Sequence, residues 1–213
     1  MTRIICLSLL VTIMFLKSYS QKIFNDGTVE YSISVAGSGS AMNDYFKDAT
    51  MKLYLRGMQS RSDLKTAMGN TTTIYDNQSG NAVMLNEYGG QKILVRMNAE
   101  QYKQINKKYE NPSIEQTSDA KVINGYKCVL TKIVFSDGKI FSIYNSTELN
   151  FHNNYYGIPV KLNGFPLEYE SEIGGIRVVY KAKSVDTNPV AAGIFDIPQA
   201  GYREMNFDEM PKQ

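Results

Sequence analysis

The chain has 213 residues, 43% of them hydrophobic and 21% charged, and a formal net charge of +2. This length corresponds to one domain, or at most two small ones, and is enough to bury a core without disulfides. A nearly neutral chain without a basic run is not typical of proteins that bind nucleic acid or dock electrostatically on a membrane.

The N-terminus has the pattern of a signal peptide. Arg3 precedes an apolar run from Ile4 to Leu16, and small residues up to Ser20 follow it. The apolar run is too short to span a bilayer. The pattern therefore predicts a signal peptide over residues 1–20 that is cleaved after Ser20. We expect export to the periplasm of a Gram-negative bacterium, with extracellular release as the alternative.

The mature chain would be one domain over residues 21–213, without a transmembrane segment. Cleavage removes Arg3 and Lys17, which lowers Lys plus Arg from 23 to the 21 of Asp plus Glu. The mature chain is then neutral, and Cys128 is its one cysteine. A lone cysteine cannot form an intramolecular disulfide. Because Cys128 stands in an apolar strand pattern, we predict a buried thiol.

Strands dominate the first half of the chain. Residues 27–35 alternate cleanly between apolar and polar, which predicts a strand. Residues 42–49 have helical spacing and predict a short helix or a packed loop. The polar run 59–66 is predicted to lie at a sheet edge or open to solvent, and a Thr-rich strand over residues 70–75 follows. Residues 49–57 alternate again and place three apolar side chains inward: Met51, Leu53 and Leu55.

A hairpin and a helix come next. Residues 82–87 and 92–97 flank Gly89-Gly90, a two-residue hairpin turn that should place Glu87 opposite Lys92. Asn98 with Gln101 then forms a capping-box pattern, which predicts a helix over residues 99–109. Its apolar stripe consists of three residues: Tyr102, Ile105 and Tyr109. We expect the polar stretch 113–119 to be a loop.

Two further hairpins complete the pattern. The first flanks Asp137-Gly138 and is apolar on both faces, so we expect cover on both faces. Its second strand includes Phe141 and Ile143. The second hairpin turns at Gly174-Gly175, and pairing Ile173 with Ile176 would place Glu172 opposite Arg177 and Glu168 opposite Lys181. Opposite charges across a pair of strands favour that register.

The residues that carry chemistry are few. His152 is the one histidine in the sequence, which disfavours histidine-rich metal sites and catalytic triads. Glu168, Glu170 and Glu172 share one strand face, and two of them have cations opposite, which favours a structural role over a pair of catalytic carboxylates. We predict no enzyme activity, no metal site and no cofactor.

About ten strands with one good helix fit two architectures. One is a curved, incompletely closed antiparallel barrel with helices in its mouth. The other is a sandwich.

Four segments resemble a known family: F-x-x-G-T-V-E-Y from Phe24, M-K-L-Y-L-R-G from Met51, G-Y-K-C-V-L-T-K from Gly125 and F-D-I-P-Q-A-G-Y from Phe195. Behind a signal peptide, they are similar to a domain-of-unknown-function family of the Gram-negative envelope that itself resembles the lipoprotein carrier LolA. The resemblance implies a mainly β fold: one curved, incompletely closed antiparallel barrel with a helical lid over an apolar hollow.

The resemblance also implies a site and a function. The hollow would be lined by the inward side chains of the strands and the lid: Met51, Leu53, Leu55, Val95, Met97, Tyr102, Ile105, Phe141 and Ile143. It would bind a lipid or an acyl chain, with a role in envelope lipid or lipoprotein handling. The alternative is a structural or protein-interaction module of the envelope with a filled core, whose partner the sequence does not identify. A hydrolase ranks third, because no polar cluster for it is found.

Overall fold

The structure, a computed structural model, describes residues 23–37, 44–109, 111–151 and 162–210. The predicted signal peptide and His152 lie outside these residues. The described strands are β1 (Ile23–Phe24), β2 (Asp26–Val35), β3 (Thr50–Arg56), β4 (Gln59–Thr66), β5 (Gly69–Asp76), β6 (Ala82–Tyr88), β7 (Gln91–Met97), β8 (Ser113–Ile123), β9 (Tyr126–Val134), β10 (Ile140–Ser146), β11 (Asn150–Phe151), β12 (Phe165–Ile173), β13 (Ile176–Asp186) and β14 (Arg203–Met205). The helix α1 spans Ala99–Ile105, and 3₁₀ helices span Lys107–Tyr109, Ala192–Phe195 and Phe207–Glu209.

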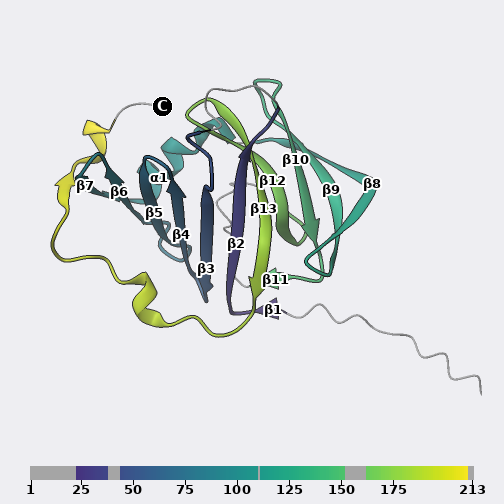
Figure 1. The fold of residues 1–213 in the computed structure, drawn as a ribbon, viewed down its shortest axis with the longest axis horizontal. Helices are drawn as coiled ribbons and strands as arrows, with labels where there is room; N and C mark the ends of the chain where they lie inside the picture. Colours follow the sequence, from purple (N-terminus) through teal and green to yellow (C-terminus); the bar gives the residue numbers. More distant parts are fainter. Residues whose placement is uncertain (1–22, 38–43, 110, 152–161, 211–213) are drawn as a thin grey trace, which may run out of the picture.

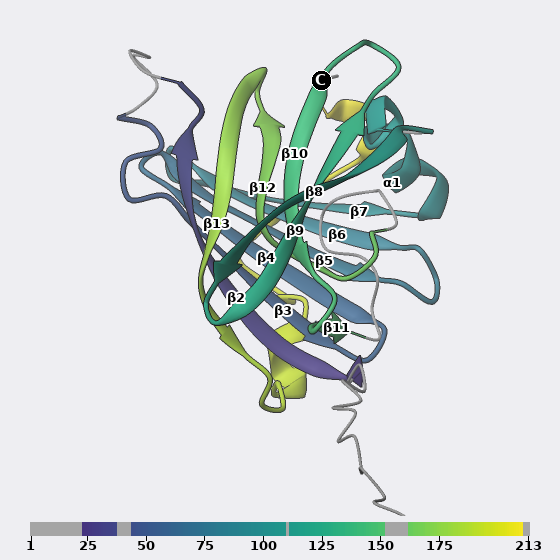
Figure 2. The ribbon, with the colours of Figure 1, turned by 90° about the vertical axis from the view of Figure 1, so that its right-hand side faces the viewer.

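Twelve of the strands form one sheet in the order β14-β7-β6-β5-β4-β3-β2-β13-β12-β10-β9-β8. The sheet curves so strongly that β8–β10 and β12 face β3–β6 across its concave side (Figures 1 and 2). In the described part of the chain, β14 and β8 form its two edges and do not pair with each other. The predicted fold, a mainly β, curved and incompletely closed barrel, is therefore confirmed, and the sandwich alternative is not observed.

The turns of the β6–β7 and β12–β13 hairpins form where glycine pairs allow a positive φ. Gly174 and Gly175 have φ of 56° and 80°, values that side chains with a Cβ disfavour. The predicted register is confirmed, because Ile173 pairs with Ile176 and Glu172 lies opposite Arg177.

The ion pairs of this hairpin differ from the expected ones. Glu168 pairs with Lys121 at 2.6 Å instead of with Lys181, and Glu172 pairs with Lys139 at 2.6 Å instead of with Arg177. Both lysines belong to the β8–β10 side of the sheet. Strand twist and the length of the lysine side chains make these partners reachable.

Two predictions for polar stretches are wrong. Residues 113–119 form the first part of β8 and are not a loop. Most of this edge strand is exposed on both faces, which explains why it lacks the alternation expected of a half-buried strand. The run 59–66 is β4 and pairs with β3 on one side and β5 on the other, so it lies inside the sheet and not at an edge.

The predicted helix is present but shorter than expected. Asn98 caps α1 by accepting a hydrogen bond from the amide of Gln101, whose side chain accepts one from the amide of Asn98. The helix ends at Ile105, and a 3₁₀ turn carries Tyr109 against the ring of Phe135 at 5.3 Å. Tyr109 thus contacts the hairpin of β9 and β10 through Phe135.

That hairpin is buried on one face and partly covered on the other, where Leu130 is only 8% exposed. Phe141 and Ile143 belong to the main core, whereas Ile140 on the other face is 46% exposed. The expectation that both faces are covered is wrong for Ile140. Cys128 is a fully buried free thiol, as predicted, and burial raises its pKa to about 11. Residues 44–48 form turns in which Phe46 is buried, which is the packed-loop alternative.

The segment 187–210, which we call the C-terminal strap, crosses the convex face of β3–β7 and ends beyond β7 (Figure 1). Phe195 and Val190 pack against Ile74 of β5, and Tyr202 packs against β6 and β7. The strap then adds β14 to β7 as a parallel strand. The strap therefore covers part of the convex face of β4–β7.

Candidate functional site

A pocket of about 230 Å³ opens on the concave face, between α1 and the strands that face each other. It is lined from β3–β6, from α1 with its C-cap, and from β12 and β13. The lining residues are Met51, Leu53, Ser60, Ser62, Leu64, Thr71, Thr73, Tyr75, Met84, Tyr102, Ile105, Asn106, Tyr169, Ser171 and Tyr180.

The pocket exists because β4 and β5 carry small side chains on their inner face. Across the sheet, Leu53 pairs with Ser62, Ser62 with Thr73, and Thr73 with Met84. In this row two small hydroxyl residues lie between Leu53 and Met84. Small side chains leave unfilled the space that leucine or methionine would occupy. We call Ser60, Ser62, Thr71 and Thr73 the hydroxyl floor.

The hydroxyl floor is polar in a position where a core side chain is expected. Ser60 is only 3% exposed, and within the described residues no hydrogen bond to its hydroxyl is found. Ser62 and Thr73 are half-buried, and their hydroxyls likewise have no hydrogen bond within the described residues. Thr71 differs, because its hydroxyl donates to Asn86 Oδ1 at 3.1 Å and lies 2.6 Å from Tyr88 Oη. A buried hydroxyl without a partner costs free energy, which makes this floor unusual.

The wall opposite the floor is aromatic. Tyr169 and Tyr180 stack with ring centroids 4.6 Å apart, and Tyr31 meets both rings edge-on. Tyr169 also donates to Met51 Sδ at 4.0 Å. These contacts hold the aromatic side chains of this wall in place, since aromatic rings prefer such stacked and edge-to-face arrangements.

None of the described lining residues is charged. Burial raises the pKa of Tyr180, and burial together with Asp76 raises the pKa of Tyr75, so both phenols are neutral at pH 7. The pocket therefore offers neutral hydrogen-bonding groups and apolar surface.

The side chains expected to line a hollow fall into two groups. Met51, Leu53, Tyr102 and Ile105 line the pocket. The other five are buried in packed clusters and do not line it: Leu55, Phe141 and Ile143 in the main core, and Val95 and Met97 beside α1. Sequence reasoning missed the hydroxyl floor. The available signal was the alternation of Ser60 and Ser62 at inner positions of β4.

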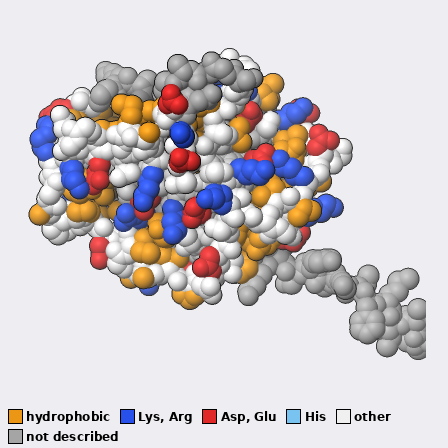
Figure 3. Space-filling view, in the orientation of Figure 1, with side chains coloured by type: hydrophobic (Ala, Val, Ile, Leu, Met, Phe, Trp, Pro, Cys, Tyr) orange, Lys and Arg blue, Asp and Glu red, His pale blue; other side chains and the backbone are white. Residues whose placement is uncertain are grey.

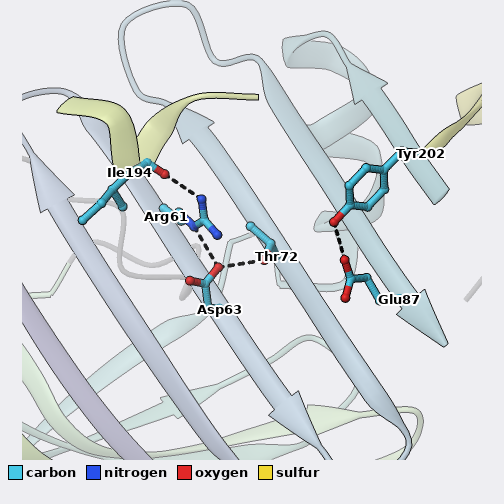
Figure 4. Close-up of polar contacts among 6 residues, drawn as sticks. All are labelled: Arg61, Asp63, Thr72, Glu87, Ile194 and Tyr202. Carbon is cyan, nitrogen blue, oxygen red and sulfur yellow. Dashed lines mark hydrogen bonds and ion pairs between the residues drawn. The ribbon is translucent and has the colours of Figure 1, made fainter. Parts of the chain in front are cut away.

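On the convex face of the same strands, the polar side chains are hydrogen-bonded within the chain. Arg61 donates from Nε to Asp63 Oδ1 at 2.8 Å and from Nη1 to the carbonyl of Ile194 in the strap at 2.6 Å. Thr72 donates to the same carboxylate oxygen of Asp63 at 2.7 Å (Figure 4). The face drawn in Figure 3 carries basic and acidic side chains interspersed, without a large area of one sign. Nothing in this arrangement resembles a ligand site.

Comparisons with known proteins concern family and fold. The family model described as "Domain of unknown function (DUF4412)" matches residues 40–158, more than half of the chain. No curated protein matches the sequence. Within the described ranges, none of the helices is long and apolar enough to cross a bilayer.

Several solved structures are similar to this chain. PNGF-II in space group P21 aligns at a TM-score of 0.50 and 11% identity, over 85% of this chain and 32% of that chain. MucB aligns at 0.43 and 10%, over 82% and 58%. LprF from Mycobacterium bovis aligns at 0.33 and 12%, over 78% and 87%. The chain spans about a third of PNGF-II, and at this identity the likeness concerns the fold alone.

Proposed function

This chain belongs to the DUF4412 family, and we propose that it is a non-catalytic protein that holds one slim hydrophobic or amphipathic ligand, such as an acyl chain, on its concave face. The observation that carries the proposal is the pocket between α1 and the hydroxyl floor. Binding pockets are concave, mostly preformed and lined by apolar groups with a few polar ones. This pocket fits that description.

The size of the pocket limits the ligand. A volume of about 230 Å³ equals roughly eight water molecules at their liquid volume. That space suits a single acyl chain or part of one. Met51 and Met84 favour a variable apolar ligand, because thioether side chains adapt their shape.

The absence of catalysis is part of the proposal. A hydrolase needs a nucleophile activated by a base, or a pair of carboxylates. Among the described residues that line the pocket, the nucleophile candidates are serine and threonine hydroxyls, and no histidine, lysine or carboxylate accompanies them. Binding without turnover is the simpler role for this set of side chains.

We also propose that the protein works in the cell envelope, in the handling of lipids or lipoproteins. The support is the signal-peptide pattern of residues 1–20. Cell fractionation of the full-length chain, with the mass of the purified product, tests this part. Cleavage after Ser20 and recovery in the periplasm are expected, and an unprocessed cytoplasmic protein would contradict it.

Ligand binding is tested by native mass spectrometry of the protein purified gently from its own envelope, followed by titration with octanoate and mono-octanoylglycerol. We expect an added mass that extracts as a lipid, or uptake of at least one probe. Ser62→Leu should abolish uptake, because leucine fills the row between Leu53 and Thr73. Lys65→Leu is the matched control, since it adds the same side chain at an exposed position of β4.

An apo mass with no uptake of either probe would overturn the binding proposal. The same holds if Ser62→Leu, folded and stable, binds as well as the unmodified protein.

The second candidate is a structural or interaction module of the envelope. It is favoured by the tight packing of Leu55, Phe141 and Ile143 and by the exposure of Ile114 and Val122 on β8, at 47% and 70%. Interaction sites, however, are contiguous apolar patches. Ile114 and Val122 lie at opposite ends of β8, so they do not form one patch. We therefore rank this candidate second.

A further inference from the structure

The hydroxyl floor narrows the class of ligand, an inference that rests on the proposed function. We infer that the floor binds a neutral polar group of the ligand, a polyol or an ester or amide, next to its acyl chain. A ligand with this group would supply the hydrogen bonds that Ser60, Ser62 and Thr73 lack in the described part of the protein.

The hydroxyl floor lowers the stability of the protein without a ligand. A purely apolar ligand needs only apolar walls, and Ala or Val at these positions would provide them with better stability. Ser60 is 97% buried by residue area, being 3% exposed, and its hydroxyl has no partner among the described residues. Polar groups at core positions are unfavourable unless something outside the fold pairs with them. A bound ligand is the partner that this geometry provides for.

The spacing of the hydroxyls also supports a ligand group with several oxygens. Ser62 and Thr73 are directly paired across β4 and β5, which puts their Cβ atoms about 5 Å apart. Ser60 is two residues from Ser62 on the same face, about 7 Å along the strand. Three hydroxyls within this distance match a group with several neutral oxygens, such as glycerol or an ester, better than a single hydroxyl.

The charge of the pocket lining also limits the ligand. The described lining residues carry no cation that could pair with a carboxylate or a phosphate. Burying an unpaired anion is far more costly than burying a neutral polar group. The neutral phenols of Tyr75 and Tyr180 agree with a site for uncharged groups. A glycerol ester should therefore bind better than the free fatty acid of the same chain length.

The experiment compares mono-octanoylglycerol with octanoate on the folded full chain by isothermal titration at pH 7.5. We expect mono-octanoylglycerol to bind about tenfold more tightly, because a few neutral hydrogen bonds add up to that factor. Ser60→Ala and Thr73→Val should each reduce its affinity several-fold and leave octanoate unchanged. Thr72→Val is the matched control, since Thr72 lies on the convex face beside Thr73 and should alter neither affinity.

Three other results would contradict the inference. Equal affinities for the two probes, unchanged in Ser60→Ala and Thr73→Val, would overturn the inference and leave acyl-chain binding intact. Tighter binding of octanoate would also overturn it. Failure of the unmodified protein to bind either probe would overturn both the inference and the proposed function.

Discussion

The two faces of β4 and β5 differ in how their polar side chains are satisfied. On the convex face, Arg61, Asp63 and Thr72 bond to one another and to the carbonyl of Ile194. On the concave face, Ser60 and Thr73 have no such bonds among the described residues. Thr72 and Thr73 are neighbours in the sequence with the same side chain, so their difference comes entirely from the face on which they lie.

The comparison separates two uses of polar residues inside a protein. A polar group that is paired within the chain stabilises the fold or costs little, whereas an unpaired one lowers stability. Natural sequences keep such destabilising features mainly where function needs them. The convex network is therefore structural, and the concave floor is the better candidate for binding. Four predictions test this separation, beginning with the one of largest expected effect.

Phe195→Ala should remove the main anchor of the strap on the convex face. The ring is buried against Ile74 and Val190, so we expect a loss of about 3–5 kcal/mol in the free energy of unfolding. Urea denaturation measures the loss, with Gln199→Ala as an exposed control in the same strap. A loss near that of the control would mean that the strap is not part of the folded core.

Arg61→Met should break the network from its centre. Asp63, which is mostly buried, would lose its cation, and the carbonyl of Ile194 would lose its donor. We expect destabilisation of about 2 kcal/mol, because bonds to charged groups are worth more than neutral ones. Lys65→Met, on the same strand at an exposed position, should change the urea midpoint little. Equal effects of the two variants would argue against the network.

Thr72→Val and Thr73→Val compare the same substitution on the convex and the concave face of β5. The first removes a donor to Asp63 and should cost about 1–2 kcal/mol, whereas the second removes an unpaired hydroxyl and should be neutral or stabilising. Thermal unfolding of both variants in parallel measures the difference. If Thr73→Val destabilised the apo protein as much as Thr72→Val, the concave hydroxyl would have a structural partner, and the distinction between the faces would fail.

Tyr202→Phe should have the smallest effect and should appear as a change in pH dependence. Tyr202 donates to Glu87 Oε1 at 2.5 Å (Figure 4). Burial and this hydrogen bond raise the pKa of Tyr202 to about 12 from 10.0. The unfolded chain therefore ionises first as the pH rises, and this contribution to stability is lost between pH 10 and about pH 12.

At acid pH, the group that matters is Glu87, and its contribution to stability is lost as the pH falls. Hydrogen bonds from Tyr202 and then Lys92 lower the pKa of Glu87 below 4.5. Its contribution is therefore present above pH 4.5 and is lost as the pH falls through the folded-state pKa. In Tyr202→Phe, both the alkaline and the acid losses should be smaller in urea midpoints measured against pH. Identical pH profiles for the variant and the unmodified protein would contradict this assignment.

Much of the fold follows from local sequence patterns. Glycine pairs locate the turns, charges opposite one another support the register of β12 and β13, and the capping box starts α1. These predictions succeed because each depends on residues close together in the chain. The two ion pairs expected between β12 and β13 do not form for the converse reason, since Lys121 and Lys139 reach Glu168 and Glu172 from elsewhere in the sheet.

The candidate site could be predicted only in part. Alternation shows that Met51, Leu53 and Leu55 point to one face, but it does not show what lies opposite them. Leu53 pairs with Ser62 and lines the pocket, whereas Leu55 is sealed in the core. The polar pattern of β4 suggested solvent, because a simple pattern assumes that inner positions are apolar. The strap is held by contacts between residues far apart in the chain, which local patterns do not report.

The strap also affects the order in which the sheet can form during synthesis. Arg96 of β7 and Glu204 of β14 are 108 positions apart and form an ion pair at 3.1 Å. During synthesis from the N-terminus, β7 is made long before the strand that covers its outer side. Until residues 203–205 have been made, β7 presents an open row of backbone groups at Ile93–Val95, a template for pairing with another chain. The arrival of β14 thus ends a period in which misassembly at this edge is favoured.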